Sequence, residues 1–267
     1  MRERHPKHPP DRDRAGHKPQ RADHVAIFGI HAVEAALANA NRSIRKLYLT
    51  DNAERRLAEA LTQRQLAHER VLPRDLDRRL GPDTVHQGAL IEAEPLEEPT
   101  LADLVERSAG RPLIVLDQVT DPHNVGAILR SGAAFGTGGL IMTRRHSPPL
   151  DGTLAKSASG ALEHVPVALV QNLARALAEL KELDCIVIGL DDAASDRIEE
   201  LAWPVRSALV LGAEGKGLRQ LTQESCDRLA RIATDGAIAS LNVSNAAAVA
   251  LHLAAMQRLG LGHPSAV

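Results

Sequence analysis

The chain has 267 residues, of which 44% are hydrophobic and 25% are charged, and its formal net charge is −2. This composition is ordinary for a globular protein, so it excludes a disordered, collagen-like or coiled-coil chain and predicts one or two domains. No stretch approaches the roughly 20 apolar residues of a membrane helix, and the charged N-terminus lacks a secretory signal, so we expect a cytoplasmic protein with no membrane partner.

Residues 1–23 carry seven Lys or Arg against four Asp or Glu, together with four prolines, which gives the segment a charge of about +3. Its low apolar content predicts a disordered basic tail. Two uses remain open at this point. The tail either attracts phosphate weakly or is a solvated extension without a role.

Residues 24–94 predict a small α/β domain. The pattern indicates helices over residues 30–40 and 52–67, and short strands over residues 46–49 and 89–94. Residues 95–110 then predict a linker followed by a short helix, because two prolines flank an acidic pair. Thr100 is expected to cap this helix, with Asp103 completing a capping box.

Residues 111–267 predict a second domain with longer, more apolar strands. Strands are expected over residues 113–116, 139–142, 165–169, 185–189 and 208–211. Helices are expected over 125–134, over 173–183 with Asn172 as its cap, and over 245–259 with Gly260 ending it. Apolar strands separated by helices indicate a parallel sheet with helices on both faces, in which ligands bind at the carboxyl ends of the strands. The two cysteines, Cys185 and Cys226, are too few for a zinc site or a disulfide framework, and we expect them to be buried fillers.

The first of three strand-end loops follows residues 113–116. Asn124 is expected to cap the next helix, and Gly126 would allow close backbone approach. Arg130 offers a planar guanidinium suited to phosphate, although an isolated arginine is more often a surface residue. Asp121 and His123 do not make a catalytic pair without geometry to support it.

The second loop runs over residues 212–218 and holds three glycines in six residues. It matches neither a Walker phosphate loop nor a dinucleotide fingerprint, so a purely structural turn is a fair alternative. Glu214 in its centre favours a binding role instead.

The third loop, residues 238–245, supplies hydroxyl and amide groups from Ser240, Asn242, Ser244 and Asn245. We expect either Ser244 or Asn245 to cap the last helix. Four such residues exceed what a helix cap requires.

Together the three loops resemble the signature motifs of the SpoU, or TrmH-type, branch of the SPOUT RNA methyltransferases. The matching patterns are Asn124-x-Gly126-x-x-x-Arg130-Ser131, Gly212-x-Glu214-Gly215-x-Gly217 and Ser240-Leu241-Asn242-Val243-Ser244. Residues 24–94, with Phe28-Gly29-Ile30-His31-Ala32-Val33 near their start, resemble the family's substrate-binding domain. The arrangement is most similar to the subgroup that methylates guanosine in large-subunit rRNA.

The resemblance implies transfer of a methyl group from S-adenosylmethionine to a ribose 2′-hydroxyl of RNA. It also implies a homodimer and a C-terminal trefoil knot. By position, the catalytic residues would be Arg130, Asn124, Glu214, Ser244 and Asn242. The cofactor would contact Leu190, Gly212, Gly215, Ile232 and Leu241, where a small residue, apolar side chains and backbone groups suit adenosine.

One position departs from the family pattern. Family members often carry a proline directly after the residue that matches Ile232, where this chain has Ala233. The change predicts a looser wall of the adenine pocket.

Three alternatives stay open from the sequence. A tRNA ribose methyltransferase would share the motifs, and a non-catalytic RNA-binding assembly factor would share the fold. A nucleotide hydrolase is less consistent, because the chain lacks the Lys and metal-binding pattern of that chemistry. We expect no metal, since the twelve histidines are scattered.

Overall fold

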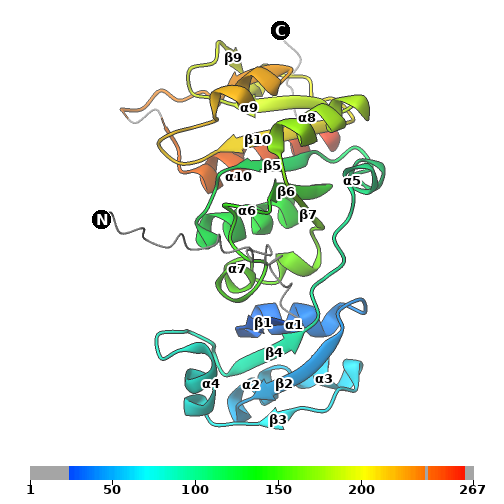
Figure 1. The fold of residues 1–267 in the computed structure, drawn as a ribbon, viewed down its shortest axis with the longest axis vertical. Helices are drawn as coiled ribbons and strands as arrows, with labels where there is room; N and C mark the ends of the chain where they lie inside the picture. Colours follow the sequence, from blue (N-terminus) through cyan, green and yellow to red (C-terminus); the bar gives the residue numbers. More distant parts are fainter. Residues whose placement is uncertain (1–23, 238–239, 262–267) are drawn as a thin grey trace, which may run out of the picture.

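The computed structural model describes residues 24–237 and 240–261, which form two units built on separate β-sheets (Figure 1). The N-terminal unit occupies one end of an elongated molecule, and the unit with the larger sheet occupies the other. The predicted basic tail and the third loop's Ile238 and Ala239 lie outside the described residues.

The N-terminal unit has a four-stranded sheet with the order β1-β4-β2-β3, in which β4 runs antiparallel to β1 and β2. Its strands are β1 (Val25–Phe28), β2 (Ile44–Leu49), β3 (Glu69–Arg70) and β4 (Ala89–Ala93). Its helices are α1 (Ile30–Ala38), α2 (Asp51–Arg56), α3 (Ala58–Arg64) and α4 (Pro73–Leu80).

The α/β character predicted for this region is confirmed, but the single helix expected over residues 52–67 is wrong. The helix is interrupted at Leu57, whose φ of −100° and ψ of 9° separate α2 from α3. Leu57 is buried in the core of the unit, so the break directs this side chain inward. Tertiary burial therefore outweighs the continuous helical propensity of the segment.

The predicted linker is irregular up to α5 (Leu101–Arg107). The capping box is confirmed. Thr100 Oγ1 accepts a hydrogen bond from the Asp103 amide at 3.1 Å, and Asp103 Oδ2 accepts one from the Thr100 amide at 2.9 Å.

The C-terminal unit contains a seven-stranded sheet with the order β7-β6-β5-β10-β8-β11-β9, and all its described pairings are parallel. Its strands are β5 (Leu113–Asp117), β6 (Gly139–Thr143), β7 (Val167–Val170), β8 (Ile186–Leu190), β9 (Asp196–Arg197), β10 (Ser207–Gly212) and β11 (Arg228–Arg231). The five predicted strands are confirmed within one or two residues at their ends. The sequence analysis missed β9 and β11, which are short and rich in charge, so they lack the apolar run by which the others were found.

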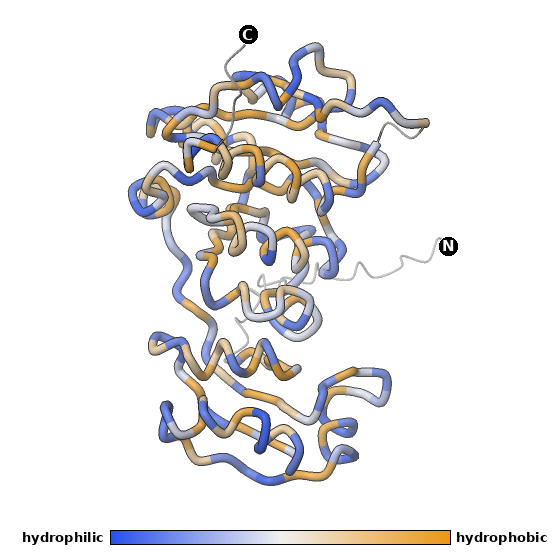
Figure 2. The backbone as a smooth tube through the Cα atoms, turned by 180° about the vertical axis from the view of Figure 1, so that it is seen from behind, coloured by the Kyte–Doolittle hydropathy of each residue, from blue (hydrophilic) through white to orange (hydrophobic). Residues whose placement is uncertain are grey.

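Helices cover both faces of this sheet, as predicted. They are α6 (Pro122–Phe135), α7 (Gly152–Ser157), α8 (Leu173–Glu182), α9 (Gln220–Ser225) and α10 (Val243–Arg258), with short 3-10 turns η1 (Ala161–Glu163) and η2 (Ile198–Glu200). Strand β5 shows how the faces divide, because Ile114 and Leu116 pack into the core that holds α6 and α10, whereas Leu113 and Val115 pack into the core that holds α8. Figure 2 shows the hydrophobic segments along the strands and helices.

Two helix caps differ from the prediction. Asp121, not Asn124, caps α6 by accepting a hydrogen bond from the His123 amide at 2.9 Å. Asn242, rather than Ser244 or Asn245, caps α10. Both errors have one cause, since Asp, Asn and Ser all suit an N-cap and the sequence alone does not say which one the chain geometry places there.

A buried polar network joins the two units. Arg42 of the N-terminal unit donates to both carboxylate oxygens of Glu163, at 3.1 and 2.6 Å, and the two side chains are only 2% and 3% exposed. The Asn39 amide donates to the same carboxylate at 2.8 Å. We call Asn39, Arg42 and Glu163 the junction cluster. Within the described part of the chain, no helix is long and apolar enough to cross a membrane.

Candidate active site

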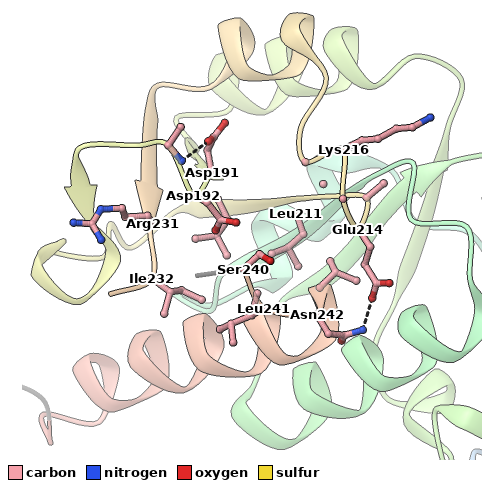
Figure 3. A pocket seen from close by; sticks show the side chains of 18 of the residues that line it. Asp191, Asp192, Leu211, Glu214, Lys216, Arg231, Ile232, Ser240, Leu241 and Asn242 are labelled. Carbon is pink, nitrogen blue, oxygen red and sulfur yellow. Dashed lines mark hydrogen bonds between the residues drawn. The ribbon is translucent and has the colours of Figure 1, made fainter. Parts of the chain in front are cut away.

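A crevice of about 600 Å³ opens at the carboxyl edge of the larger sheet (Figure 3). Its walls come from segments that follow β8, β10 and β11 and from the start of α10. This is the edge at which parallel α/β sheets bind ligands, so the strand-end rule located the crevice correctly.

All five residues that the family resemblance assigns to the cofactor line this crevice. They are Leu190, Gly212, Gly215, Ile232 and Leu241. Their role in cofactor binding stays a prediction, but the structure brings them together from four separate segments. The crevice also contains Ser240, a polar residue of the predicted third loop, and the sequence analysis missed other lining residues, namely Asp191, Asp192, Lys216, Gln223 and Arg231. Asp191 and Asp192 directly follow β8, so the strand-end rule applied to that strand could have found them.

Hydrogen bonds join three side chains, one from each predicted loop, and Figure 3 shows two of them, Glu214 and Asn242, in the wall of the crevice. The Asn124 amide donates to Glu214 Oε1 at 3.0 Å, and the Asn242 amide donates to Asn124 Oδ1 at 3.1 Å and also to Glu214 Oε1. We call Asn124, Glu214 and Asn242 the polar cluster. Because Asp121 caps α6, the Asn124 side chain is released from capping and reaches Glu214 instead.

Asn242 also connects the polar cluster to the last helix. Its Oδ1 accepts hydrogen bonds from the Ser244 amide at 2.9 Å and from the Ser244 hydroxyl at 2.5 Å. Among the described residues, Ser244 therefore connects to the polar cluster through Asn242. Of the five predicted catalytic residues, three are thus in mutual contact, Ser244 supports them, and Arg130 lies outside the polar cluster.

The glycine loop takes a shape that only glycine permits at its first position. A Cβ on Gly212 would lie 2.2 Å from the carbonyl carbon of Gly217, so any side chain would collide with backbone. The Gly217 amide donates to the Ala213 carbonyl at 2.9 Å, which closes the loop. The far end is tied down by buried Asp117, which accepts from the Arg219 amide at 3.0 Å and from its guanidinium at 2.7 Å. The loop is therefore a fixed platform beside the crevice.

Arg130 stands apart from the other predicted catalytic residues. It is exposed on α6 and does not line the crevice, and the described residues give it no hydrogen bond or ion pair. Arg130 lies six positions after Asn124 in α6, which corresponds to roughly 9 Å along the helix axis. Gly126, between them, permits close packing of α6 against α7, because a Cβ there would lie 2.5 Å from Ser157 Cβ. The Arg130 side chain is thus exposed to solvent.

The cysteines are not candidates for the chemistry. Burial raises the pKa of both the Cys185 and the Cys226 thiol to about 12, so both are neutral at physiological pH. Among residues 24–237 and 240–261, no group of three His, Cys, Asp or Glu side chains could hold a metal ion.

The chemistry of the lining residues fits a nucleoside. Leu190, Ile232 and Leu241 offer apolar contacts for a flat base, and the glycine loop presents backbone groups within reach of a ligand. The carboxylates of Asp191 and Asp192 add hydrogen-bond acceptors at the same crevice. A crevice with this lining can accept a ligand that is part heterocycle and part polar chain.

Comparisons with protein families agree with the motif assignment. A model of the SpoU rRNA Methylase family matches residues 111–252, and a model described as RNA 2'-O ribose methyltransferase substrate binding matches residues 26–99. The matches therefore cover both structural units.

Curated relatives match along most of the chain. A 23S rRNA (guanosine-2'-O-)-methyltransferase RlmB from Pseudomonas aeruginosa is 39% identical over 242 residues, which cover 88% of this chain and 97% of the relative. The protein of the same name from Ralstonia nicotianae is 42% identical over 237 residues, covering 87% and 95%. Among solved structures, the SpoU methyltransferase AviRb from Streptomyces viridochromogenes in complex with AdoMet shares the fold, with a TM-score of 0.76 at 22% identity over 89% of this chain and 91% of that one.

Proposed function

Because this chain belongs to the SpoU rRNA methylase family, we propose that it methylates the ribose 2′-hydroxyl of a guanosine in large-subunit rRNA. As a member of that family it is an S-adenosylmethionine-dependent RNA 2′-O-methyltransferase. The observation that supports the active site is the convergence of Asn124, Glu214 and Asn242 beside a crevice suited to a nucleoside. The rRNA guanosine follows the printed names of the relatives, which align with nearly their whole length.

Leu190, Gly212, Gly215, Ile232 and Leu241 are the residues that would hold the cofactor in this proposal. The cofactor supplies a methyl group that is already activated on a sulfonium. The enzyme therefore needs to align the ribose hydroxyl for in-line attack and to give its proton somewhere to go. The polar cluster, supported by Ser244, would fix the ribose at the mouth of the crevice.

Arg130 would bind the phosphate next to the target ribose. A guanidinium is effectively always protonated, so it serves as a phosphate clamp far better than as a general base. We expect Arg130→Lys to retain measurable methyl transfer while the KM for RNA rises about tenfold, because a point charge replaces a planar fork. Steady-state kinetics and RNA binding by filter retention measure the two effects. Loss of all methyl transfer with unchanged RNA affinity would instead assign Arg130 the role of base.

The remaining parts of the proposal concern organisation. Residues 24–94 would bind RNA, residues 95–110 would link them to a catalytic domain at 111–267, and the basic tail at 1–23 would add phosphate contacts. A trefoil knot and a cytoplasmic homodimer also belong to the proposal. Exposed Val249 and Leu259 on and beside α10 support pairing of two copies along this helix.

Mapping of ribose methylation tests the substrate. Total RNA from cells that lack the protein is compared with RNA from cells complemented by it, and we expect one guanosine of large-subunit rRNA to lose its methyl group. Loss confined to tRNA would establish the tRNA alternative. Calorimetry with S-adenosylhomocysteine tests the enzyme assignment itself, since a non-catalytic assembly factor predicts no saturable binding.

A further inference from the structure

A glutamate of another segment hydrogen-bonds to the backbone next to Ile232, one of the residues that line the crevice. Ile232 lines the crevice, and the amide of the next residue, Ala233, donates to Glu199 Oε1 at 3.0 Å. Glu199 lies in η2, directly after the edge strand β9, which pairs with β11 up to Arg231. The turn after β9 therefore brings Glu199 to the place where the wall leaves the sheet.

Within the described part of the chain, the bond to Glu199 is the only hydrogen bond given for the Ala233 amide. The ladder between β11 and β9 ends at Arg231, and Ala233 is exposed. Without Glu199 its amide would bond to water, and the backbone beyond Ile232 would gain freedom. A proline at this position would restrain the backbone in another way, because its ring fixes φ and it has no N–H. The Glu199 carboxylate thus restrains the backbone at Ala233 through a hydrogen bond, whereas a proline would restrain it through its ring.

The placement of Glu199 is unusual for a glutamate. Its Oε2 is buried and has no hydrogen-bond partner among the described residues. Such atoms are few in native proteins because their desolvation costs free energy. The adjacent Glu200, by contrast, has a side chain that is 70% exposed and forms an ion pair with Arg197. Of these two neighbouring glutamates, Glu199 is the one with a buried carboxylate oxygen. In this position its other oxygen accepts the hydrogen bond from Ala233.

We propose that Glu199 is a positioning residue for cofactor binding, which acts by fixing the backbone at Ile232 and Ala233. The inference rests on the proposed function, because that proposal puts the cofactor in this crevice. Under this proposal the wall at Ala233 is restrained, in contrast to the looser wall expected from the sequence. Glu199 should affect the affinity for the cofactor and leave the chemical step and RNA binding unchanged.

Calorimetry with S-adenosylhomocysteine on the full chain tests this role. We expect Glu199→Ala to weaken binding about fivefold, which corresponds to one partly exposed hydrogen bond to a charged group. Glu199→Gln should bind within about twofold of the wild type, because its amide oxygen still accepts from Ala233. In kinetics, KM for S-adenosylmethionine should rise with Glu199→Ala while kcat and KM for RNA stay constant.

A second variant separates this role from general stabilisation. Ala233→Pro removes the donor and restrains the backbone, so it should bind within about twofold of the wild type, and adding Glu199→Ala to it should cost nothing further. Glu200→Ala is the matched control and should bind as the wild type does. Emission from Trp203, the chain's single tryptophan, reports whether the segment after η2 stays packed.

Specific results would overturn the proposal. Wild-type affinity in Glu199→Ala would do so, as would a fivefold loss that persists in the Ala233→Pro background. If Glu199→Ala alone does not fold, the double variant Glu199→Ala/Ala233→Pro is used to measure cofactor binding. An unfolded double variant would contradict the proposal, because it would show that Glu199 stabilises more of the fold than the backbone at Ala233. Absence of binding by the wild type would instead count against the proposed function.

Discussion

Two polar clusters connect distant parts of this chain, and they differ chiefly in burial. In the junction cluster, Asn39 and Arg42 donate to Glu163, and the ion pair is almost fully buried. In the polar cluster of the crevice, Asn124 donates to Glu214, which is exposed. In each cluster an asparagine amide donates to a glutamate carboxylate that is distant in sequence, 124 residues away in the first and 90 in the second.

The difference in burial separates a structural role from a functional one. In the junction cluster both glutamate oxygens are occupied, so no ligand can use them. In the polar cluster the hydrogen bonds given by the described residues converge on Glu214 Oε1 only, and the site opens on the crevice. Polar groups that keep unused bonding capacity beside a cavity are the ones available to a substrate.

Breaking the junction cluster should have the largest effect on stability. Glu163→Ala leaves the Arg42 charge buried without its partner, so we expect a loss of about 3–5 kcal/mol in the free energy of unfolding. Urea denaturation followed by circular dichroism measures it. Glu200→Ala is the matched control, because it removes an exposed carboxylate that pairs loosely with Arg197, and it should leave the transition unchanged. An equally small shift for Glu163→Ala would show that the junction cluster does not hold the units together.

Breaking the polar cluster should lower activity and leave stability almost unchanged, the opposite of the effect expected for the junction cluster. Glu214→Gln exchanges a carboxylate for an amide where two asparagine amides donate, so the ribose site is misaligned while little buried structure is lost. We expect kcat to fall about 100-fold with an unchanged urea transition. Glu224→Gln is the control, since Glu224 also accepts an amide hydrogen bond, from Gln220, but lies on α9 away from the polar cluster. A stability loss in Glu214→Gln comparable to that of Glu163→Ala would erase the distinction between the clusters.

The sequence predicted one of these clusters and missed the other for a physical reason. Asn124 and Glu214 follow predicted apolar strands, and parallel strands bring their carboxyl ends to one edge, whereas the family motif placed Asn242 with them. Arg42 and Glu163 lie 121 residues apart, and no local pattern pairs them. Their contact depends on how two domains pack, which no local signal encodes.

The errors within the site have a similar origin. Asn124 was expected to cap α6 because its side chain suits that position, whereas Asp121 does so three residues earlier. Likewise, Asn242 caps α10 and also joins the polar cluster. The sequence identified residue types that suit an N-cap, such as Asp and Asn. The backbone geometry determines which of these residues caps the helix.

A substitution in the linker between the two units should have the smallest effect on stability, and it serves as a reference for the variants in both clusters. Thr100 and Asp103 form an exposed cluster that touches neither the crevice nor the junction, so its loss should affect only α5. We expect Thr100→Ala to cost about 1 kcal/mol in the free energy of unfolding at pH 7. The same urea titration measures it, with methyl transfer unchanged.

The pH dependence of this small effect identifies its source. Hydrogen bonds donated by the Thr100 hydroxyl and amide hold the pKa of Asp103 below its usual value of 3.8. A carboxylate with a lowered pKa in the folded state stabilises the protein above its unfolded pKa, and this contribution is lost as the pH falls through the folded value. The difference between wild type and Thr100→Ala should therefore be constant near neutral pH and shrink once the pH drops below 3.8. A difference that stays the same at pH 3 and pH 7 would mean that Thr100 acts through its bond to the Asp103 amide alone, and the carboxylate would then play no part in the cap.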